Sequence, residues 1–226
     1  RAARVPFKPL TDATGSDEER RELSPFTTPF AHQLAILEVQ LDIAVEMRRN
    51  VSVHSVKAAQ QTRELLDQMK ERHGKEWRRI SVDLHSCGLS PQVWAEIEKH
   101  QPNAFLSLST VINARSPNHR LLIEAVNPSR LLVESDFHDI RYSAERTWEM
   151  TRTVAEVKSW RLEDVWDYGD GEDADHRSDE DLGTVKRLED NWKSFVRGRH
   201  KEVRKLSRKE RSGTWDKWGD SESEED

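Results

Sequence analysis

The stretch SRLLVESDFHD, residues 129–139, is the most informative part of the sequence because it has the pattern of a buried strand that ends in acids. Its apolar run LLV is too short for a helix, and the run stops at ESD, which contains Glu134 and Asp136. An apolar run of this kind is typical of a parallel strand that is buried on both faces. We therefore predict a strand over residues 130–135. Glu134 and Asp136 are two positions apart, a spacing at which residues of an extended chain point to one face.

Two earlier stretches show the same strand pattern, with a histidine in place of the acids at the end. VSVH ends at His54, and ISVDLH, residues 80–85, ends at His85. Taken alone, each could be a histidine that only caps a strand end. Together with Asp136, they predict a metal site at the ends of parallel strands, because imidazole and carboxylate are common metal ligands. Such a site suits hydrolysis, since a metal lowers the pKa of bound water and polarises a phosphoryl or carbonyl oxygen.

Helical and strand patterns alternate along the chain, which indicates an α/β fold with parallel strands and right-handed crossovers. Both a doubly wound sheet and a (β/α)8 barrel fit, and functional residue types at several strand ends favour the barrel. Only four strands are predicted, about half of the number in a closed barrel. The expected strands are 51–54, 80–85, 104–108 and 130–135, and the expected helices are 26–50, 58–73, 90–100, 116–126, 143–160 and 182–199.

The composition divides the chain into a folded part and charged, solvated parts. Hydrophobic residues make up 35% of the 226 residues and charged residues also 35%, with a net charge of −6 that argues against a protein that coats nucleic acid. We expect a loop-like linker over 1–25, a folded domain over 26–200 with an acidic loop near 168–183, and a disordered charged tail over 201–226. Docking of the tail to a basic partner is the alternative to simple solvation.

The cysteine count and the hydropathy of the sequence also indicate the cellular compartment. One cysteine excludes an internal disulfide and fits a reducing compartment, so we expect the cytoplasm, the nucleus or both. No apolar run approaches the roughly 20 residues of a membrane span, so no membrane partner is expected.

Further polar residues come after the predicted strand ends. Lys57 and Arg115 could bind phosphate, and solvated positions are the equal alternative. His138 and Asp139 lie just past the last strand, where they could contact substrate. Cys87 lies two residues after His85, and beside a metal a soft thiol is a more natural ligand or bystander than a nucleophile.

Three motifs, in order, resemble the TatD family of metal-dependent deoxyribonucleases. VSVHSVKA (51–58) resembles the family's "PVxxHxRxA", LHSCG (84–88) its "HCFSG", and LLVESD (131–136) its "LLLETD". The resemblance covers about residues 26–160. Two further stretches, SLSTVINARSP (107–117) and DLHSCGLSP (83–91), are most similar to a fungal branch known for interacting with an anaphase-promoting-complex subunit.

The resemblance implies a TIM-barrel metallo-dependent hydrolase with two divalent ions (Mg, Mn or Zn). His54 and His85 match metal ligands of the family, and Asp136 matches the aspartate that binds metal and activates water. The implied substrate is DNA or another phosphodiester. The alternative is a catalytically silent barrel that binds a cell-cycle protein complex.

Several family features are absent from this sequence. It contains neither the HxH motif of the first strand nor the "GExGLD" glutamate, and residues 1–7 resemble the family's segment just after that glutamate. Lys57 replaces the usual arginine, and Phe137 and His138 replace a small residue and proline, which leaves the substrate preference open. We therefore expect a partial barrel, about the C-terminal four β/α units, that by itself is neither a competent enzyme nor a well-behaved monomer.

Overall fold

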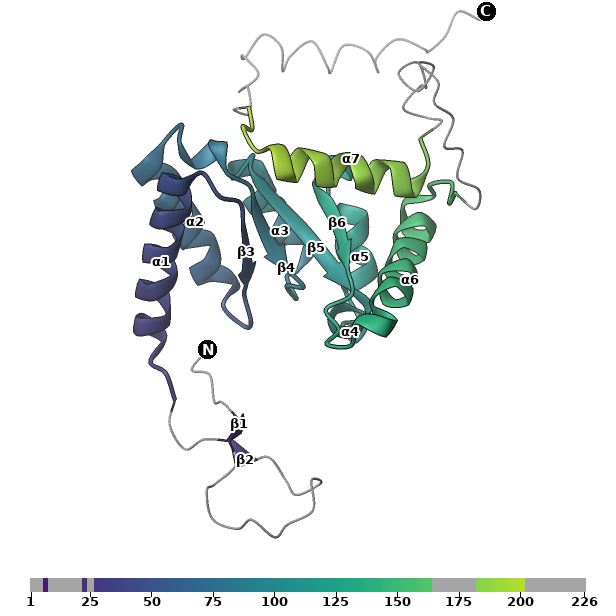
Figure 1. Cartoon of the computed structure of the whole chain (residues 1–226), viewed down its shortest axis with the longest axis horizontal. Coiled ribbons are helices and arrows are strands. Elements are labelled where there is room, and N and C mark those ends of the chain that lie inside the picture. The colour runs from purple at the N-terminus through teal and green to yellow at the C-terminus, as the bar shows by residue number, and fades with distance from the viewer. Residues whose placement is uncertain (1–5, 8–21, 24–26, 164–181, 202–226) are drawn as a thin grey trace, which may run out of the picture.

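The centre of the molecule is an open sheet of four parallel strands, in the order β3-β4-β5-β6 (Figure 1). The strands are β3 (Val51–His54), β4 (Val82–His85), β5 (Ala104–Ser109) and β6 (Leu131–Glu134). The computed structural model describes residues 6–7, 22–23, 27–163 and 182–201. Every strand pairs with the next one along the chain, as expected for successive β/α units.

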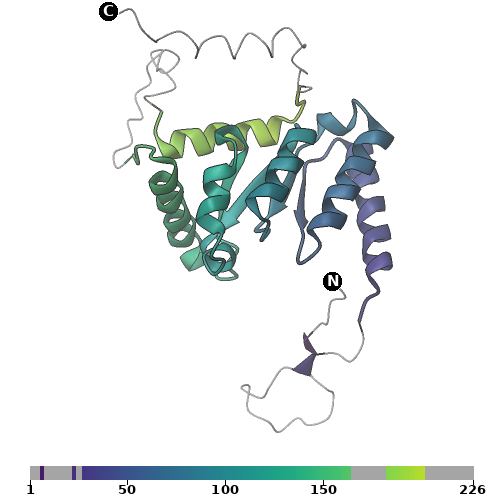
Figure 2. The same cartoon turned by 180° about the vertical axis from the view of Figure 1, so that it is seen from behind.

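The longer helices lie mainly on one face of the sheet, which Figure 2 shows from that side. Apart from Phe195 of the last helix, which packs against Phe105 and Leu132, the described helices leave most of the other face open, as the partial-barrel prediction requires. These helices are α1 (Phe30–Met47), α2 (Ala59–His73), α3 (Pro91–His100), α5 (His119–Ala125) and α6 (Ile140–Lys158). The connections also contain three short helices, η1 (Trp77–Arg79), α4 (Thr110–Asn113) and η2 (Pro128–Arg130).

The apolar core lies between the sheet and these helices. Alternate strand residues, among them Leu84 and Leu106, point into it and are fully buried. Helix residues such as Met69, Trp94 and Ile97 meet them and have no exposed surface. Burial of this kind contributes about 25 cal/mol for each Å² of apolar surface removed from water, so the helix-covered face is the main source of stability.

A last helix, α7 (Thr184–Arg197), crosses the ends at which the strands begin (Figure 1). Its Asn191 side chain donates to the carbonyls of Pro128 (2.6 Å) and Leu131 (2.8 Å), at the start of β6. Near its other end, the Phe195 carbonyl accepts from Asn50 Nδ2 (2.7 Å) and Ser81 Oγ (2.6 Å), just before β3 and β4. These side-chain hydrogen bonds hold α7 across the sheet.

The element boundaries agree with the sequence prediction to within four residues, and the structure adds short elements that were not predicted, among them η1 and η2. Helix α6 begins at Ile140, three residues early, because the Asp139 side chain accepts from Arg141 N (3.1 Å) and caps it. The short helix α4 was not predicted. Within 1–25, expected to be loop, β1 (Pro6–Phe7) pairs antiparallel with β2 (Glu22–Leu23).

Two other expectations concern parts of the chain that the structure does not describe. Most of the acidic loop near 168–183 and almost all of the tail over 201–226 lie outside the described residues. Within the described residues, no helix is both long and apolar enough to span a bilayer.

Gly198 should be intolerant of any side chain. Its φ is 62°, and a Cβ built on it would lie 2.3 Å from the Arg79 carbonyl oxygen, too close for real atoms. Gly198→Ala is therefore expected to lower the free energy of unfolding by about 1–3 kcal/mol, measured by urea denaturation. Gly88→Ala is the control, because a Cβ there meets no atom within 4 Å, and an equal loss in both variants would contradict the prediction.

Candidate functional site

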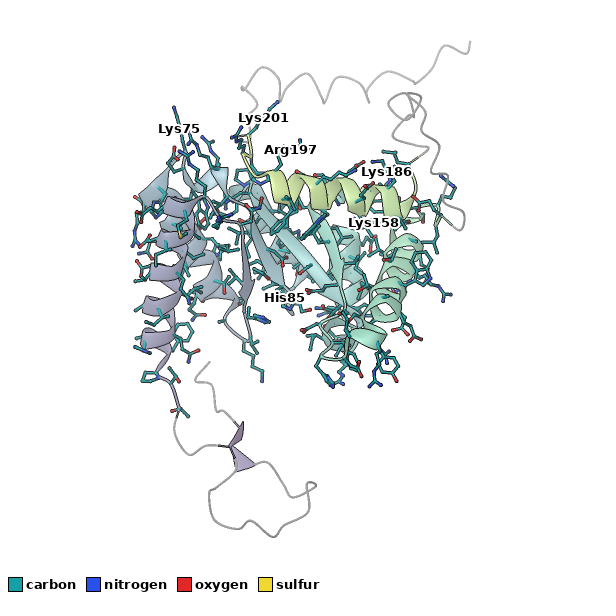
Figure 3. The ribbon with its side chains drawn as sticks, in the orientation of Figure 1. Lys75, His85, Lys158, Lys186, Arg197 and Lys201 are labelled. Atoms are coloured by element: carbon teal, nitrogen blue, oxygen red, sulfur yellow. The ribbon has the colours of Figure 1, made fainter. Side chains whose placement is uncertain are left out.

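His85 is the centre of a polar cluster at the carboxyl ends of the strands. Its Nδ1 is in close contact with Glu134 Oε2, and its Nε2 lies 3.4 Å from Asp136 Oδ1. The His54 ring stands edge-on to it, with 4.5 Å between the ring centroids. The structure thus brings His54, His85 and Asp136 together, and Figure 3 shows His85 at the end of the sheet away from α7.

The strand register explains this convergence. His54 is the register partner of His85 across β3 and β4, and both are the last residues of their strands. His85 pairs in turn with Ser107, and Ser109 pairs with Glu134 at the end of β6. Because side chains at i and i+2 share a face, the site residues lie on the open face, opposite the packed apolar core.

Asp136 reaches the site differently from the prediction. Strand β6 ends at Glu134, and Asp136 has a φ of 43°, in the left-handed region that non-glycine residues rarely adopt. Asp136 therefore lies beyond the strand that ends at Glu134. The turn after the strand places Asp136 beside Nε2 of His85, while Glu134 contacts Nδ1 of the same ring.

Glu134 is a site residue that the sequence reasoning did not assign. Its Oε1 accepts from Ser86 Oγ (2.7 Å) and Ser107 Oγ (3.0 Å), while its Oε2 is paired with His85. Ser86 Oγ also lies 2.8 Å from Ser109 Oγ. The sequence signal that could have identified Glu134 is the group of serines near the ends of the neighbouring strands, because their hydroxyls can donate to a carboxylate. Together these contacts fix the carboxylate that orients the His85 ring.

A second carboxylate lies beneath this cluster, on the same face of β4. Asp83 Oδ2 accepts from Ser52 Oγ (3.0 Å), and its Oδ1 accepts from Ser107 N (3.0 Å). The Ser107 hydroxyl, with its single proton, lies 3.0 Å from both Asp83 Oδ2 and Glu134 Oε1. The pKa of Asp83 is raised to about 6, chiefly by burial, with the hydrogen bond from Ser107 opposing the rise and the Glu134 charge adding to it.

Both carboxylates border a cavity of about 380 Å³ on the open face. Residues from all four strands of the sheet and from α7 line it, namely Ser52, Asp83, His85, Ser107, Leu132, Val133, Glu134, Leu188, Trp192 and Phe195. Its wall is acidic at the site end and apolar beside α7.

The donor chemistry of the cluster fits a divalent metal ion. A proton on His85 Nδ1, held by Glu134, leaves the lone pair of Nε2 directed toward the side of Asp136 and available to a cation. His54 adds a second imidazole, and imidazole with carboxylate is a donor set that many divalent ions accept. Within the described ranges, no three His, Cys, Asp or Glu side chains are already arranged around one metal position.

The remaining candidates lie around the cluster rather than in it. Lys57 and Arg115 are exposed, and among the described contacts no hydrogen bond or ion pair links either of them to His85. His138 is exposed, with its ring 4.7 Å from that of Phe137. Cys87 is buried, and burial raises the pKa of its thiol to about 12, so it stays protonated at neutral pH.

The sequence is similar to proteins of one family. A family model described as "TatD related DNase" matches residues 14–168. "Cut9-interacting protein scn1" of Schizosaccharomyces pombe is 28% identical over 167 residues, which cover 63% of this chain and 50% of that protein. The chain therefore spans about half the length of this curated relative. A crystal structure of an uncharacterized amidohydrolase from Saccharomyces cerevisiae matches with a TM-score of 0.40 and 17% identity, over 62% of this chain and 43% of that one.

The family match extends over all four strands of the sheet, with His54 and His85 at the strand ends, and over the turn that carries Asp136. It agrees with the α/β architecture and with the partial barrel that the parallel sheet displays. The fold is thus that of a TIM-barrel metallo-dependent hydrolase, represented here by four β/α units, and the chain belongs to the TatD related DNase family.

Proposed function

We propose that the protein acts as a metal-dependent hydrolase that cleaves phosphodiester bonds in DNA. One observation supports this most directly: His85 is held between two carboxylates, Glu134 on Nδ1 and Asp136 on Nε2, with the His54 ring beside it. That arrangement orients the His85 imidazole as a ligand and keeps a carboxylate next to it.

Each residue then has a distinct role in the reaction. His54, His85 and Asp136 would hold one or two divalent ions, which when bound polarise a phosphoryl oxygen and make water nucleophilic at neutral pH. Asp136 would accept the proton of the attacking water, a task that a carboxylate on a loop beside the ligands can perform. Glu134 would keep the proton on His85 Nδ1.

The substrate phosphates need cations at the rim of the site. Lys57 lies just after β3 and is exposed, with a φ of 55°. We assign phosphate contacts to Lys57, Arg115 and His138, the exposed basic residues of the loops after the strands. A nucleic-acid strand could then lie across the carboxyl ends of β3 to β6.

A second candidate function comes from the S. pombe relative, whose name describes it as interacting with Cut9. By analogy, this chain could serve as a binding protein for a cell-cycle complex, with or without catalysis. Loss of all metal-dependent cleavage with retention of partner binding in the full-length protein would favour this role.

Metal removal tests the proposed hydrolysis. The full-length protein, stripped with EDTA and dialysed, should regain cleavage of a DNA substrate when Mg²⁺, Mn²⁺ or Zn²⁺ is added. His85→Gln should weaken metal binding by about 10–100-fold in calorimetry, because the ring that the carboxylates hold is gone. His100→Gln, an exposed histidine on α3, is the matched control. Cleavage that does not respond to any of the three metals would refute the proposal.

A further inference from the structure

The end of the molecule opposite the candidate site carries a concentrated positive charge. Three segments meet there: residues 48–50 after α1, residues 75–79 after α2, and residues 197–201 at the end of α7. They contain eight arginine and lysine side chains and one carboxylate, Glu76, which gives a net charge of +7 in a chain whose total is −6. We call the eight the basic cluster: Arg48, Arg49, Lys75, Arg78, Arg79, Arg197, Arg199 and Lys201.

Backbone and amide hydrogen bonds hold the three segments side by side. Arg199 N donates to the Arg79 carbonyl (3.2 Å), and His200 N donates to the Arg78 carbonyl (2.7 Å). Asn50 Nδ2 donates to the carbonyls of Phe195 (2.7 Å) and Val196 (3.0 Å), which brings the end of α1 to α7. The basic cluster is therefore one surface built from distant parts of the sequence.

Most of the cluster points into solvent. Arg48, Arg49, Lys75, Arg79 and the three cations of residues 197–201 are exposed. Figure 3 shows Lys75, Arg197 and Lys201 at the end of the molecule far from His85. Two other labelled lysines at this end do not belong to the cluster: Lys186 is paired with Asp190 and Glu189, and Lys158 donates to the carbonyls of Glu124 and Val126.

His200 contributes structure rather than charge. Burial, together with the charge of nearby Arg130, lowers its pKa to about 4, so the ring is neutral at pH 7. Its Nε2 lies 2.7 Å from Ser81 Oγ, under the cluster. The positive charge of this surface thus comes from arginine and lysine and does not vary across the physiological pH range.

We propose that the basic cluster binds the phosphate backbone of duplex nucleic acid, at a surface separate from the candidate catalytic site. Six of its eight cations are arginines, whose planar guanidinium groups bind phosphate oxygens in pairs. The three segments offer no exposed tryptophan, tyrosine or phenylalanine on which a base could stack, since Trp77 is fully buried. Backbone contacts without stacking favour a duplex and binding that is independent of sequence.

A nucleic acid bound at this surface would lie at the end of the molecule opposite the strand ends that carry His85. The contact would raise the local concentration of nucleic acid without occupying the candidate site. Catalysis and this binding are then separable by mutation.

The test compares two triple variants that remove equal charge. Arg49→Gln, Arg197→Gln and Lys201→Gln neutralise three exposed members of the cluster. Arg63→Gln, Arg120→Gln and Arg152→Gln remove three arginines from α2, α5 and α6, outside the cluster. Each full-length protein is titrated with a fluorescent DNA duplex of about 20 base pairs, in EDTA, over a range of salt concentrations, and its fold is checked by circular dichroism.

The cluster variant should bind the duplex about tenfold more weakly than the wild type, and its plot of log affinity against log salt should be less steep by about 2 to 3. The control variant should change affinity by less than about twofold. Absence of duplex binding by the wild type, or equal losses in both variants, would overturn the proposal. Cluster-dependent binding to vesicles of anionic lipid without binding to the duplex would overturn it as well.

Discussion

Asp136→Asn should lower the rate of metal-dependent DNA cleavage by the full-length protein by about 10²–10⁴-fold. The amide keeps the shape of the side chain but loses the negative charge that faces His85 Nε2 at 3.4 Å. It can neither accept a proton from water nor bind a cation as a carboxylate does. The measurement is the initial rate of cleavage of a labelled duplex at saturating metal.

Asp139→Asn is the matched control for Asp136→Asn, because it makes the same chemical change three residues further along. Asp139 caps α6 through Arg141 N and pairs with the Arg141 side chain, and asparagine caps helices about equally well. Its variant should therefore keep nearly full activity. If both variants lost activity equally, or if Asp136→Asn turned over at the wild-type rate, Asp136 would not belong to the reacting groups.

Glu134→Gln should reduce metal affinity by about 10–100-fold while the protein remains folded. The glutamine amide can still meet Ser86 and Ser107, but it no longer offers a charged acceptor to His85 Nδ1. The imidazole then becomes a weaker base at Nε2, and its other tautomer becomes accessible. Calorimetric titration with metal measures the first effect, and the ¹⁵N chemical shifts of His85 measure the second.

The control for Glu134→Gln is Glu145→Gln, an exposed glutamate on α6. It removes the same charge from a helix surface and should change neither the metal affinity nor the His85 tautomer. A Glu134→Gln variant with wild-type metal affinity and an unchanged tautomer would show that Glu134 only fills space beside the ring.

Much of the fold could be predicted from local signals. Ser90 and Pro91 mark the start of α3 in the sequence, and in the structure the Ser90 hydroxyl accepts from Val93 N (3.3 Å). Apolar runs that end in His54 and His85 predicted β3 and β4 to within two residues. Such signals work because capping and side-chain periodicity act over only a few residues.

The parts that escaped prediction depend on contacts between distant segments. Glu134 became a site residue only because the register places it beside Ser109 and within reach of His85. Asp136 reaches His85 because its own backbone is left-handed, and a conformation of this kind is usually predicted from a glycine, which this position lacks. The basic cluster likewise consists of residues up to about 150 positions apart, which single-sequence patterns cannot bring together.

The reactivity of the buried Cys87 thiol can be used to measure local unfolding of this chain. The side chain is 1% exposed, burial raises its pKa to about 12, and the sequence contains no second cysteine. Alkylating reagents attack the thiolate, so the native molecule should resist them, whereas an opened molecule reacts as a normal cysteine does. The rate of alkylation would therefore measure how often the loop beside His85 opens, in the native sequence and without an engineered label.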